Sequence, residues 1–322
     1  MKTRITELLG IEIPIISGPI GIITSPKWIA DFCNLGGLGI VAAVHMSPRG
    51  LRECIRKIRE MTDKPFGVNL LPINLRPDEL LEVMVEEKVP VFSYGRGDPT
   101  KSIHAAIKAG SIAMPTVGRL YHAQKAVKEG AHALMVTGTE AGGHTSFIGT
   151  MTLVPMVCRA VEVPVVAGGG ITVPEQFAAA LTLGADAIEM GTRLLVTKEA
   201  PIHNNVKQRF VEASADETLS TVHISGRHLR GLLNKYRQQF IGLPDLLQLP
   251  EGEELGFASP RVKKWLAYAR KGFIEGDVEN SCIECGQGIG LIDDIPTVAE
   301  VIERMIQGVG PALDRAKAIV SS

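Results

Sequence analysis

The sequence predicts an α/β protein: a TIM (β/α)8 barrel with an inserted small helical lid domain. Eight short apolar runs punctuate the first two thirds of the chain. They are continuously apolar, as parallel strands covered on both faces usually are, and a helical pattern follows almost every run. Eight such β-then-α units predict a barrel. The expected strands cover residues 14–18, 38–43, 66–71, 89–94, 112–117, 133–137, 163–167 and 187–190.

Start and stop residues place the helices between these strands. Pro26 and Pro48 open two helices, and Pro174 stands near the start of another that ends before Gly184. This is the usual asymmetry, with proline early and glycine just past the end. The rival fold is a doubly wound sheet with a GxGxxG fingerprint after its first strand. Gly36-Gly37-Leu38-Gly39 precedes its strand instead, which favours the barrel.

The strand rhythm stops after residue 202, so three regions are expected. Residues 1–202 form the main part of the barrel, and residues 203–276 form an inserted helical lid without clear strands. The lid includes a loop rich in Pro and Glu at residues 249–254. Residues 277–322 return to the barrel and end in C-terminal helices, one of which is expected at residues 297–307.

Composition narrows the classes of function. The chain is 45% hydrophobic and 21% charged, with a formal net charge of −1. This balance does not suggest a nucleic-acid or membrane partner, so the expected partner is a small-molecule substrate; a homodimer is left open. Five cysteines and no signal-peptide pattern suggest reduced thiols and a cytoplasmic protein.

Glycines at the ends of two neighbouring strands predict a phosphate site. Gly168-Gly169-Gly170 ends the seventh strand, and Gly191-Thr192 ends the eighth. Backbone N–H groups freed by glycine bind phosphate well, especially beside a helix N-terminus, and TIM barrels often use these two loops. Tight turns alone would explain one such loop but explain the pair less well.

A histidine after the sixth strand is the candidate for proton transfer. Glu140-Ala141-Gly142-Gly143-His144 follows the run that ends at Thr137. Glycine lets the backbone approach a ligand closely, and histidine has the side-chain pKa nearest neutrality. A purely structural histidine is less expected in a βα loop behind two glycines.

Several of these stretches together resemble one family. The chain is similar to the nitronate monooxygenase (2-nitropropane dioxygenase) family, which includes flavin-dependent enoyl-acyl-carrier-protein reductases and NAD(P)H:quinone reductases. The similarity covers almost the whole sequence. The matching segments are Arg4-Ile5-Thr6-Glu7-Leu8-Leu9-Gly10-Ile11, Pro14-Ile15, Gly36-Gly37-Leu38-Gly39, Thr62-Asp63-Lys64-Pro65-Phe66-Gly67-Val68-Asn69, Glu140-Ala141-Gly142-Gly143-His144 and Gly191-Thr192-Arg193.

The resemblance implies FMN as cofactor, bound by residues 1–202, and a role for individual residues. His144 would be catalytic. The FMN phosphate would be held by Gly168, Gly169, Gly170, Gly191 and Thr192. The flavin ring and ribityl chain would lie along Gly18, Pro19, Ile20, Asn69 and Glu140, with Gly142 and Gly143 letting the loop pass close and Gln287 closing over them.

Three activities are compatible with these residues. The first expectation is an FMN-dependent nitronate monooxygenase that oxidises alkyl nitronates with O₂. The alternative is a reductase of enoyl thioesters or quinones, with NAD(P)H as co-substrate. A remote third is a flavin-free barrel like IMP dehydrogenase, which would need a nucleophilic cysteine in a βα loop. Cys282 and Cys285 are the cysteines expected in loops, and they are read as reduced thiols, not as part of a metal site.

Overall fold

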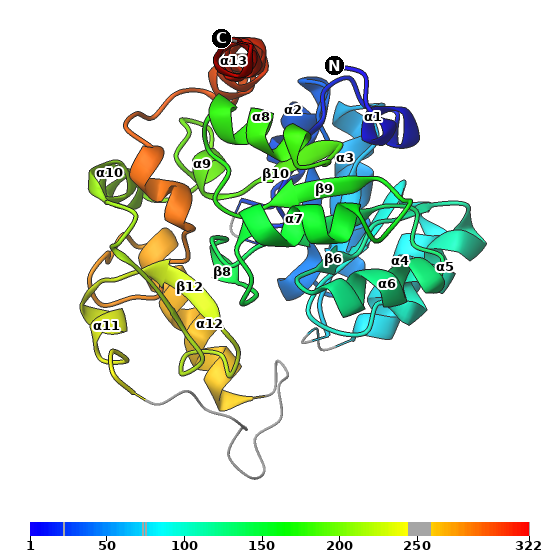
Figure 1. Cartoon of the computed structure of the whole chain (residues 1–322). Helices are drawn as coiled ribbons and strands as arrows, with labels where there is room; N and C mark the ends of the chain where they lie inside the picture. The colour runs from blue at the N-terminus through cyan, green and yellow to red at the C-terminus, as the bar shows by residue number, and fades with distance from the viewer. Residues whose placement is uncertain (22, 73, 75, 244–258, 322) are drawn as a thin grey trace.

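The structure, a computed structural model, describes residues 1–21, 23–72, 74, 76–243 and 259–321. Parallel strands lie at its centre and helices cover them, as in an α/β protein (Figure 1). The strands that belong to the central sheets all pair in parallel. They are β1 (Ile15–Ser17), β2 (Ile40–Ala42), β3 (Gly67–Leu70), β4 (Val91–Tyr94), β5 (Ile112–Ala113), β6 (Thr116–Val117), β7 (Leu134–Thr137), β9 (Val165–Gly168) and β10 (Ala187–Met190).

Two parallel sheets contain these strands. A five-stranded sheet has the order β1-β10-β9-β7-β6, and a four-stranded sheet has the order β2-β3-β4-β5. Ile16 of β1 forms a parallel bridge with Leu38, just before β2. On the other side, one short stretch of chain supplies β5 to the second sheet and β6 to the first. All eight predicted strands are therefore confirmed, although the run 112–117 is split into two short strands around Met114 and Pro115.

Helices follow the strands and begin largely where the sequence places them. Proline occupies the first turn of α2, α3, α4 and α8, and the sequence predicts all four of these starts. The first helices are α1 (Arg4–Leu9), α2 (Pro26–Asn34), α3 (Pro48–Met61), α4 (Pro77–Glu86), α5 (Thr100–Ala109), α6 (Leu120–Lys128), α7 (Thr150–Cys158) and α8 (Pro174–Thr182); the short 3-10 helix η1 (Ala43–His45) follows β2.

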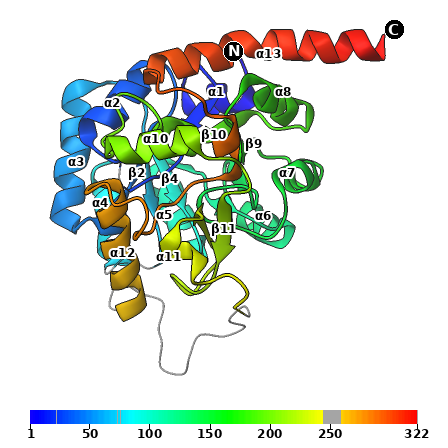
Figure 2. The same cartoon turned by 90° about the vertical axis from the view of Figure 1, so that its left-hand side faces the viewer.

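The remaining helices lie in the last third of the chain. They are α9 (Thr192–Leu195), α10 (Asn204–Glu212), α11 (Lys235–Gln238), α12 (Pro260–Phe273), the 3-10 helix η2 (Gln287–Leu291) and α13 (Val298–Val320). Helix α13 is much longer than expected and runs on past the rest of the molecule (Figure 2). Among the described residues, no helix combines the length and apolarity that a membrane crossing requires.

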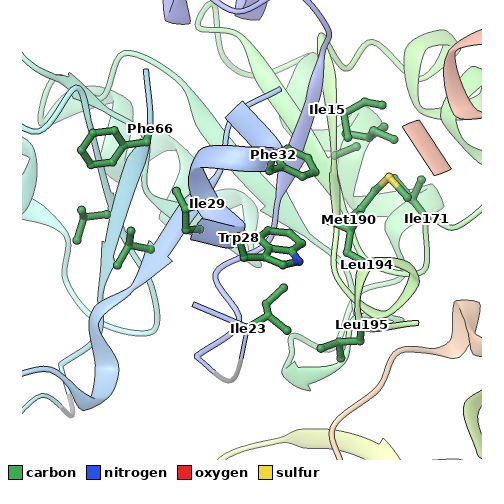
Figure 3. Packing of buried hydrophobic residues seen from close by; sticks show 14 of the residues in the cluster. Ile15, Ile23, Trp28, Ile29, Phe32, Phe66, Ile171, Met190, Leu194 and Leu195 are labelled. Atoms are coloured by element: carbon green, nitrogen blue, oxygen red, sulfur yellow. The ribbon is translucent and has the colours of Figure 1, made fainter. Parts of the chain in front are cut away.

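Neighbouring residues of a strand face two separate cores. In β1, Ile15 packs into the large cluster beneath the helices, whereas Ile16 packs with Leu38, Val166 and Ala187 in a smaller cluster between the strands. Ile5 and Leu9 of α1 belong to the smaller cluster. This alternation is the period of two that a strand imposes. Figure 3 shows part of the large cluster, where Trp28 stacks on Phe32 with ring centres 5.5 Å apart.

The insertion differs from its prediction, because residues 203–276 are not purely helical. They contain β11 (Thr218–Thr221) and β12 (Leu229–Leu232), an antiparallel hairpin that pairs through β12 with β8 (Gly143–His144). The expectation of a lid without strands was wrong. Each strand has four residues, and Arg230 and Gly231 weaken the strand signal of the second. The predicted loop 249–254 lies outside the described residues.

Candidate active site

A cavity of about 750 Å³ opens where the central strands end. That volume falls in the upper part of the range of about 300–1,000 Å³ that is typical of small-molecule sites. His144 and most of the predicted cofactor-binding residues line it. Those residues are Gly18, Pro19, Ile20, Asn69, Gly142, Gly143, Gly169, Gly170, Gly191 and Thr192. Residues far apart in the sequence are thus brought to one place.

Three predicted cofactor residues do not line this cavity. The carboxylate of Glu140 accepts hydrogen bonds from the backbone N–H of Thr150, at 2.8 and 3.0 Å, and so caps the start of α7. The backbone N–H of Gln287 donates to the carbonyl oxygen of Glu140 at 2.9 Å. Gly168 ends β9, where a side chain would overlap the carboxylate of Glu189. Their contacts with a cofactor stay predictions.

Backbone geometry at the glycine loops suits a phosphate-bearing ligand. Gly169 and Gly170 have φ angles of +102° and +78°, which residues with side chains rarely adopt. A Cβ at Gly169 would lie 2.9 Å from Thr150 Oγ1, so the turn has no room for one. At Gly191 the nearest atom to a Cβ would be Ile20 Cδ1 at 3.8 Å, which means that the backbone there borders open space. This glycine-lined surface fits a group that must approach the backbone closely, as the FMN phosphate does.

His144 is held by the three-stranded sheet and by one hydroxyl. It lies in β8, opposite Leu229 of β12. Its Nε2 is 2.7 Å from Ser225 Oγ, and the Ser225 hydroxyl donates to the carbonyl oxygen of Arg227 at 3.2 Å. Because a hydroxyl has one proton to donate, Ser225 accepts from Nε2–H in this network. Nδ1 then carries the lone pair; this nitrogen is buried, and no described residue donates to it.

The surroundings of His144 keep its imidazole neutral. Burial, followed by the positive charges of Arg96, Arg227 and Arg237, holds the pKa of His144 well below its usual range. The ring also packs edge-on against Trp265 of α12, with ring centres 5.0 Å apart. A neutral imidazole that lines a cavity is suited to accept a proton from a ligand there.

Two buried acids of the cavity were missed by the sequence interpretation. Glu189 of β10 accepts a hydrogen bond from Thr137 Oγ1 at 3.0 Å, and burial raises the pKa of its carboxyl. Glu284 accepts from the indole N–H of Trp265, and burial again raises the pKa of the carboxyl. Both line the cavity. An acid within the apolar strand Ala187-Ile188-Glu189-Met190 was a usable signal for the first; Glu284 had none.

The raised pKa of Glu189 predicts a pH dependence of stability. The folded chain keeps a proton that an unfolded chain releases above about pH 4.3, so the free energy of unfolding should fall as the pH rises from there. Glu189→Gln should flatten this fall in urea unfolding of the cofactor-free protein between pH 5 and 8. The exposed Glu212→Gln is the matched control and should leave the slope as it is. An unchanged slope in Glu189→Gln would show that this carboxyl is ionised in the folded protein.

The two loop cysteines are sealed inside the fold. Cys282 and Cys285 are 0% and 1% exposed. Burial raises the pKa of Cys285 to about 12 and that of Cys282 well above its usual value. A nucleophilic cysteine needs an accessible thiolate. Neither thiol meets that need, so the interpretation as inert, reduced thiols fits the structure best.

The family comparison decides what kind of chain this is. The family model described as nitronate monooxygenase matches residues 2–308. The chain belongs to the nitronate monooxygenase family. The family resemblance predicted from the sequence is thereby confirmed.

Relatives of this nitronate monooxygenase family member carry several names. A (3aS,4S,5R,7aS)-5-hydroxy-7a-methyl-1-oxo-octahydro-1H-indene-4-carboxyl-CoA dehydrogenase of Mycobacterium tuberculosis is 31% identical, over 99% of each chain. A probable nitronate monooxygenase of Staphylococcus aureus is 26% identical, over 74% of this chain and 80% of its own. The homologues therefore include oxidoreductases with different substrates.

Solved structures of the family have the same fold. FabK of Thermotoga maritima superposes with a TM-score of 0.90 and 34% identity, over 99% of both chains. Nitroalkane oxidase of Streptomyces ansochromogenes superposes with a TM-score of 0.83 and 26% identity, over 98% of this chain and all of that one. These neighbours are of the TIM-barrel type.

Proposed function

We propose that this chain is an FMN-dependent oxidoreductase whose substrate is an acyl thioester. The CoA dehydrogenase and the enoyl reductase FabK match it at 31% and 34% identity over 99% of their lengths. The Staphylococcus aureus nitronate monooxygenase matches at 26% over 74% of this chain. The names of these two better-matched proteins indicate substrates that are acyl thioesters. The higher identities to these two proteins favour the alternative of a thioester-acting enzyme over the nitronate monooxygenase that the sequence first suggested.

The observation that carries the proposal is the difference between two walls of the cavity. The glycine loops after β9 and β10 supply one part of the lining, the first wall, and α12 supplies another, the second wall. Trp265, Leu266 and Phe273 of α12 and Ile274 just after it are apolar, whereas Arg270 of α12 is charged. A flat, phosphorylated cofactor suits the first wall, and an apolar acyl group suits the second. A small alkyl nitronate would leave much of the apolar wall uncovered.

We infer that the two parallel sheets close into a (β/α)8 barrel beneath this site. The bridge between Ile16 and Leu38 and the shared segment 112–117 support closure. We retain the predicted division into 1–202, 203–276 and 277–322, with the middle region as a lid of helices and a hairpin. The packing of Trp265 on His144 supports a covering role for that region.

Each side of the site would then have a distinct task. When bound, FMN supplies the two-electron redox chemistry at the substrate carbon. Gly169, Gly170, Gly191 and Thr192 would hold its phosphate through backbone N–H groups. His144 would move a proton at the carbon next to the thioester carbonyl. The apolar wall of α12 would exclude water from the acyl group.

Nitronate oxidation is the second candidate, and one feature favours it. A neutral His144 that lines the cavity is suited to removing the acidic α-proton of a nitroalkane. The nitroalkane oxidase neighbour supports the same activity. The flavin-free alternative has no such support, because its nucleophilic cysteine would have to be one of two buried thiols.

The cofactor is tested first, on the purified full chain. We expect yellow protein, or stoichiometric FMN uptake by colourless protein. Gly191→Ala should weaken FMN binding at least tenfold and leave the unfolding midpoint of the cofactor-free protein unchanged, since the new methyl group meets no protein atom closer than 3.8 Å. A chain that never takes up FMN would reject the proposal.

The substrate is tested by anaerobic mixing of the yellow protein. A saturated acyl-CoA, NADH, NADPH and propane-2-nitronate are compared for bleaching of the flavin, and crotonyl-CoA for reoxidation. Bleaching by NADH or NADPH with reoxidation by crotonyl-CoA indicates a reductase. Bleaching by the acyl-CoA indicates a dehydrogenase. Bleaching only by the nitronate would replace the proposal with the second candidate.

A further inference from the structure

Arg96 has an unusual backbone conformation for a residue with a long side chain. It follows β4, between Gly95 and Gly97, and its φ angle is +68°. Residues with a Cβ avoid this left-handed region, and the exceptions concentrate at functional sites. Lys88 is the other non-glycine residue with a positive φ among those described. Of the two, Arg96 lines the cavity.

The guanidinium of Arg96 has no anionic partner within the described part of the chain. Its recorded contact is with the ring of Trp265, whose centre lies 6.0 Å from Cζ. Other charged arginines commonly have a partner; Arg193, for example, bonds Asp294 at 3.1 Å. The acid that acts on Arg96 is Glu284, whose carboxyl binds the indole N–H of Trp265. Glu284 therefore offsets the charge of Arg96 only through space, without a direct ion pair among the described residues.

A second arginine adds to this charge. Arg227 interacts electrostatically with Arg96, and both lower the pKa of His144. Arg227 also accepts the Ser225 hydroxyl at its backbone carbonyl, which places it next to the network that orients His144. Two arginines close to one another without a bound anion repel, and a negatively charged ligand would relieve that repulsion.

Trp265 brings Arg96 and His144 to the same small region. The indole contacts the imidazole of His144 at 5.0 Å between ring centres and the guanidinium of Arg96 at 6.0 Å. All three side chains line one cavity. One ligand in this cavity can therefore meet both His144 and Arg96.

We infer that Arg96 forms a subsite for the negatively charged oxygen of the substrate, and that Arg227, which does not line the cavity, adds to the positive charge around it. When His144 takes a proton from the reacting carbon, the electron pair of that C–H bond moves towards the neighbouring oxygen. The oxygen is the carbonyl oxygen of a thioester, or a nitro oxygen of a nitroalkane. The guanidinium stabilises the resulting enolate or nitronate. The reaction rests on the proposed function, whereas binding of a small oxyanion beside His144 does not.

Anaerobic equilibrium dialysis of the full chain loaded with reduced FMN, which cannot oxidise the ligand, tests this subsite with propane-2-nitronate, an anion of this class, and with neutral 2-nitropropane. Arg96→Gln should weaken nitronate binding at least tenfold and change 2-nitropropane binding less than twofold. Arg227→Gln should have a smaller effect, and Arg96→Lys should retain part of the affinity. Arg119→Gln is the matched control, because Arg119 also faces an aromatic ring, that of Phe147 at 5.0 Å, but is not among the cavity-lining residues.

A folding defect can be separated from a loss of charge. Arg96→Gly relieves the left-handed strain, so it should keep or raise the unfolding midpoint while losing nitronate binding as Arg96→Gln does. Unchanged nitronate affinity in both variants would overturn the inference. So would weakened binding of inorganic phosphate with unchanged nitronate binding, which would make the subsite a phosphate site.

The outcomes for the subsite and for the proposed function are distinct. A protein that binds nitronate through Arg96 but shows no flavin chemistry with thioesters or NAD(P)H keeps the subsite and rejects the thioester proposal. A thioester oxidoreductase whose Arg96→Gln variant binds nitronate normally keeps the function and rejects the subsite. Crotonyl-CoA turnover is measured in the same variants to make this separation.

Discussion

His144→Ala should lower turnover by about 10²–10⁴-fold, the usual contribution of a positioned general acid or base. Its Nδ1 lone pair lacks a partner in the described protein, and Ser225 holds the ring through Nε2. FMN binding and the unfolding midpoint should change little, because β8 pairs with β12 through backbone atoms that the substitution leaves in place. Steady-state rates with the substrate identified by anaerobic mixing are the measurement.

Two variants sharpen that experiment. His45→Ala changes another cavity-lining histidine and should reduce the rate far less than His144→Ala. Ser225→Ala should lower the turnover number more than it raises KM, because it frees the ring to adopt the wrong tautomer. If His144→Ala turns over within twofold of the unaltered protein, proton transfer must be assigned to another group.

Gly142→Ala should destabilise the fold by about 3 kcal/mol, near the upper end of what overpacking usually costs. A Cβ at Gly142 would lie 2.6 Å from the carbonyl carbon of Cys285 and 2.7 Å from the backbone nitrogen of Gly286. Both are backbone atoms, which cannot turn aside as the end of a flexible side chain can. The segments around Gly142 and Gly286 must therefore move apart. Because both residues line the cavity, its wall is displaced as well. Urea unfolding measures the loss, and FMN binding should weaken in parallel.

Gly310→Ala provides the matched control. Gly310 lies within α13, and nothing stands within 4 Å of an added Cβ. Alanine favours a helix by about 1 kcal/mol over glycine, so this variant should be as stable as the unaltered protein or more stable. Equal destabilisation by the two substitutions would mean that the contact between Gly142 and Gly286 does not limit the packing.

The central fold could be predicted because each strand and helix carries its own local signal. Continuous apolar runs located β1 to β10 except β8, and prolines located the starts of α2 and α3. The hairpin β11–β12 could not be found in this way, because its partner β8 lies more than sixty residues away in the chain and consists of Gly143 and His144. Pairing over such a distance leaves no periodic pattern in either segment.

The site residues divide in the same way, into those with a local sequence signal and those without one. Glycines at strand ends and His144 are visible as motifs, and the structure brings them to one cavity. Trp265 and Glu284 belong to it only because α12 and the segment before η2 pack over the strands. Glu140 shows the converse limit: the motif marks it, but its carboxylate binds Thr150 at the start of α7. A motif fixes which residues are near a site and leaves open which of their atoms face it.

The pairing of β8 with β12 has a consequence for engineering this chain. His144 comes from the loop after β7, yet its backbone belongs to the sheet of the insertion (Figure 1). Exchange of residues 203–276 for the equivalent region of a relative would therefore replace the strand that sets the position of His144, the proposed proton-transfer group, together with Ser225. Chimaeras that also transplant residues 138–149 should retain activity more often than those that transplant the insertion alone. Residues 138–149 and 203–276 should then be exchanged together, because substrate range and acid–base chemistry would depend on both segments.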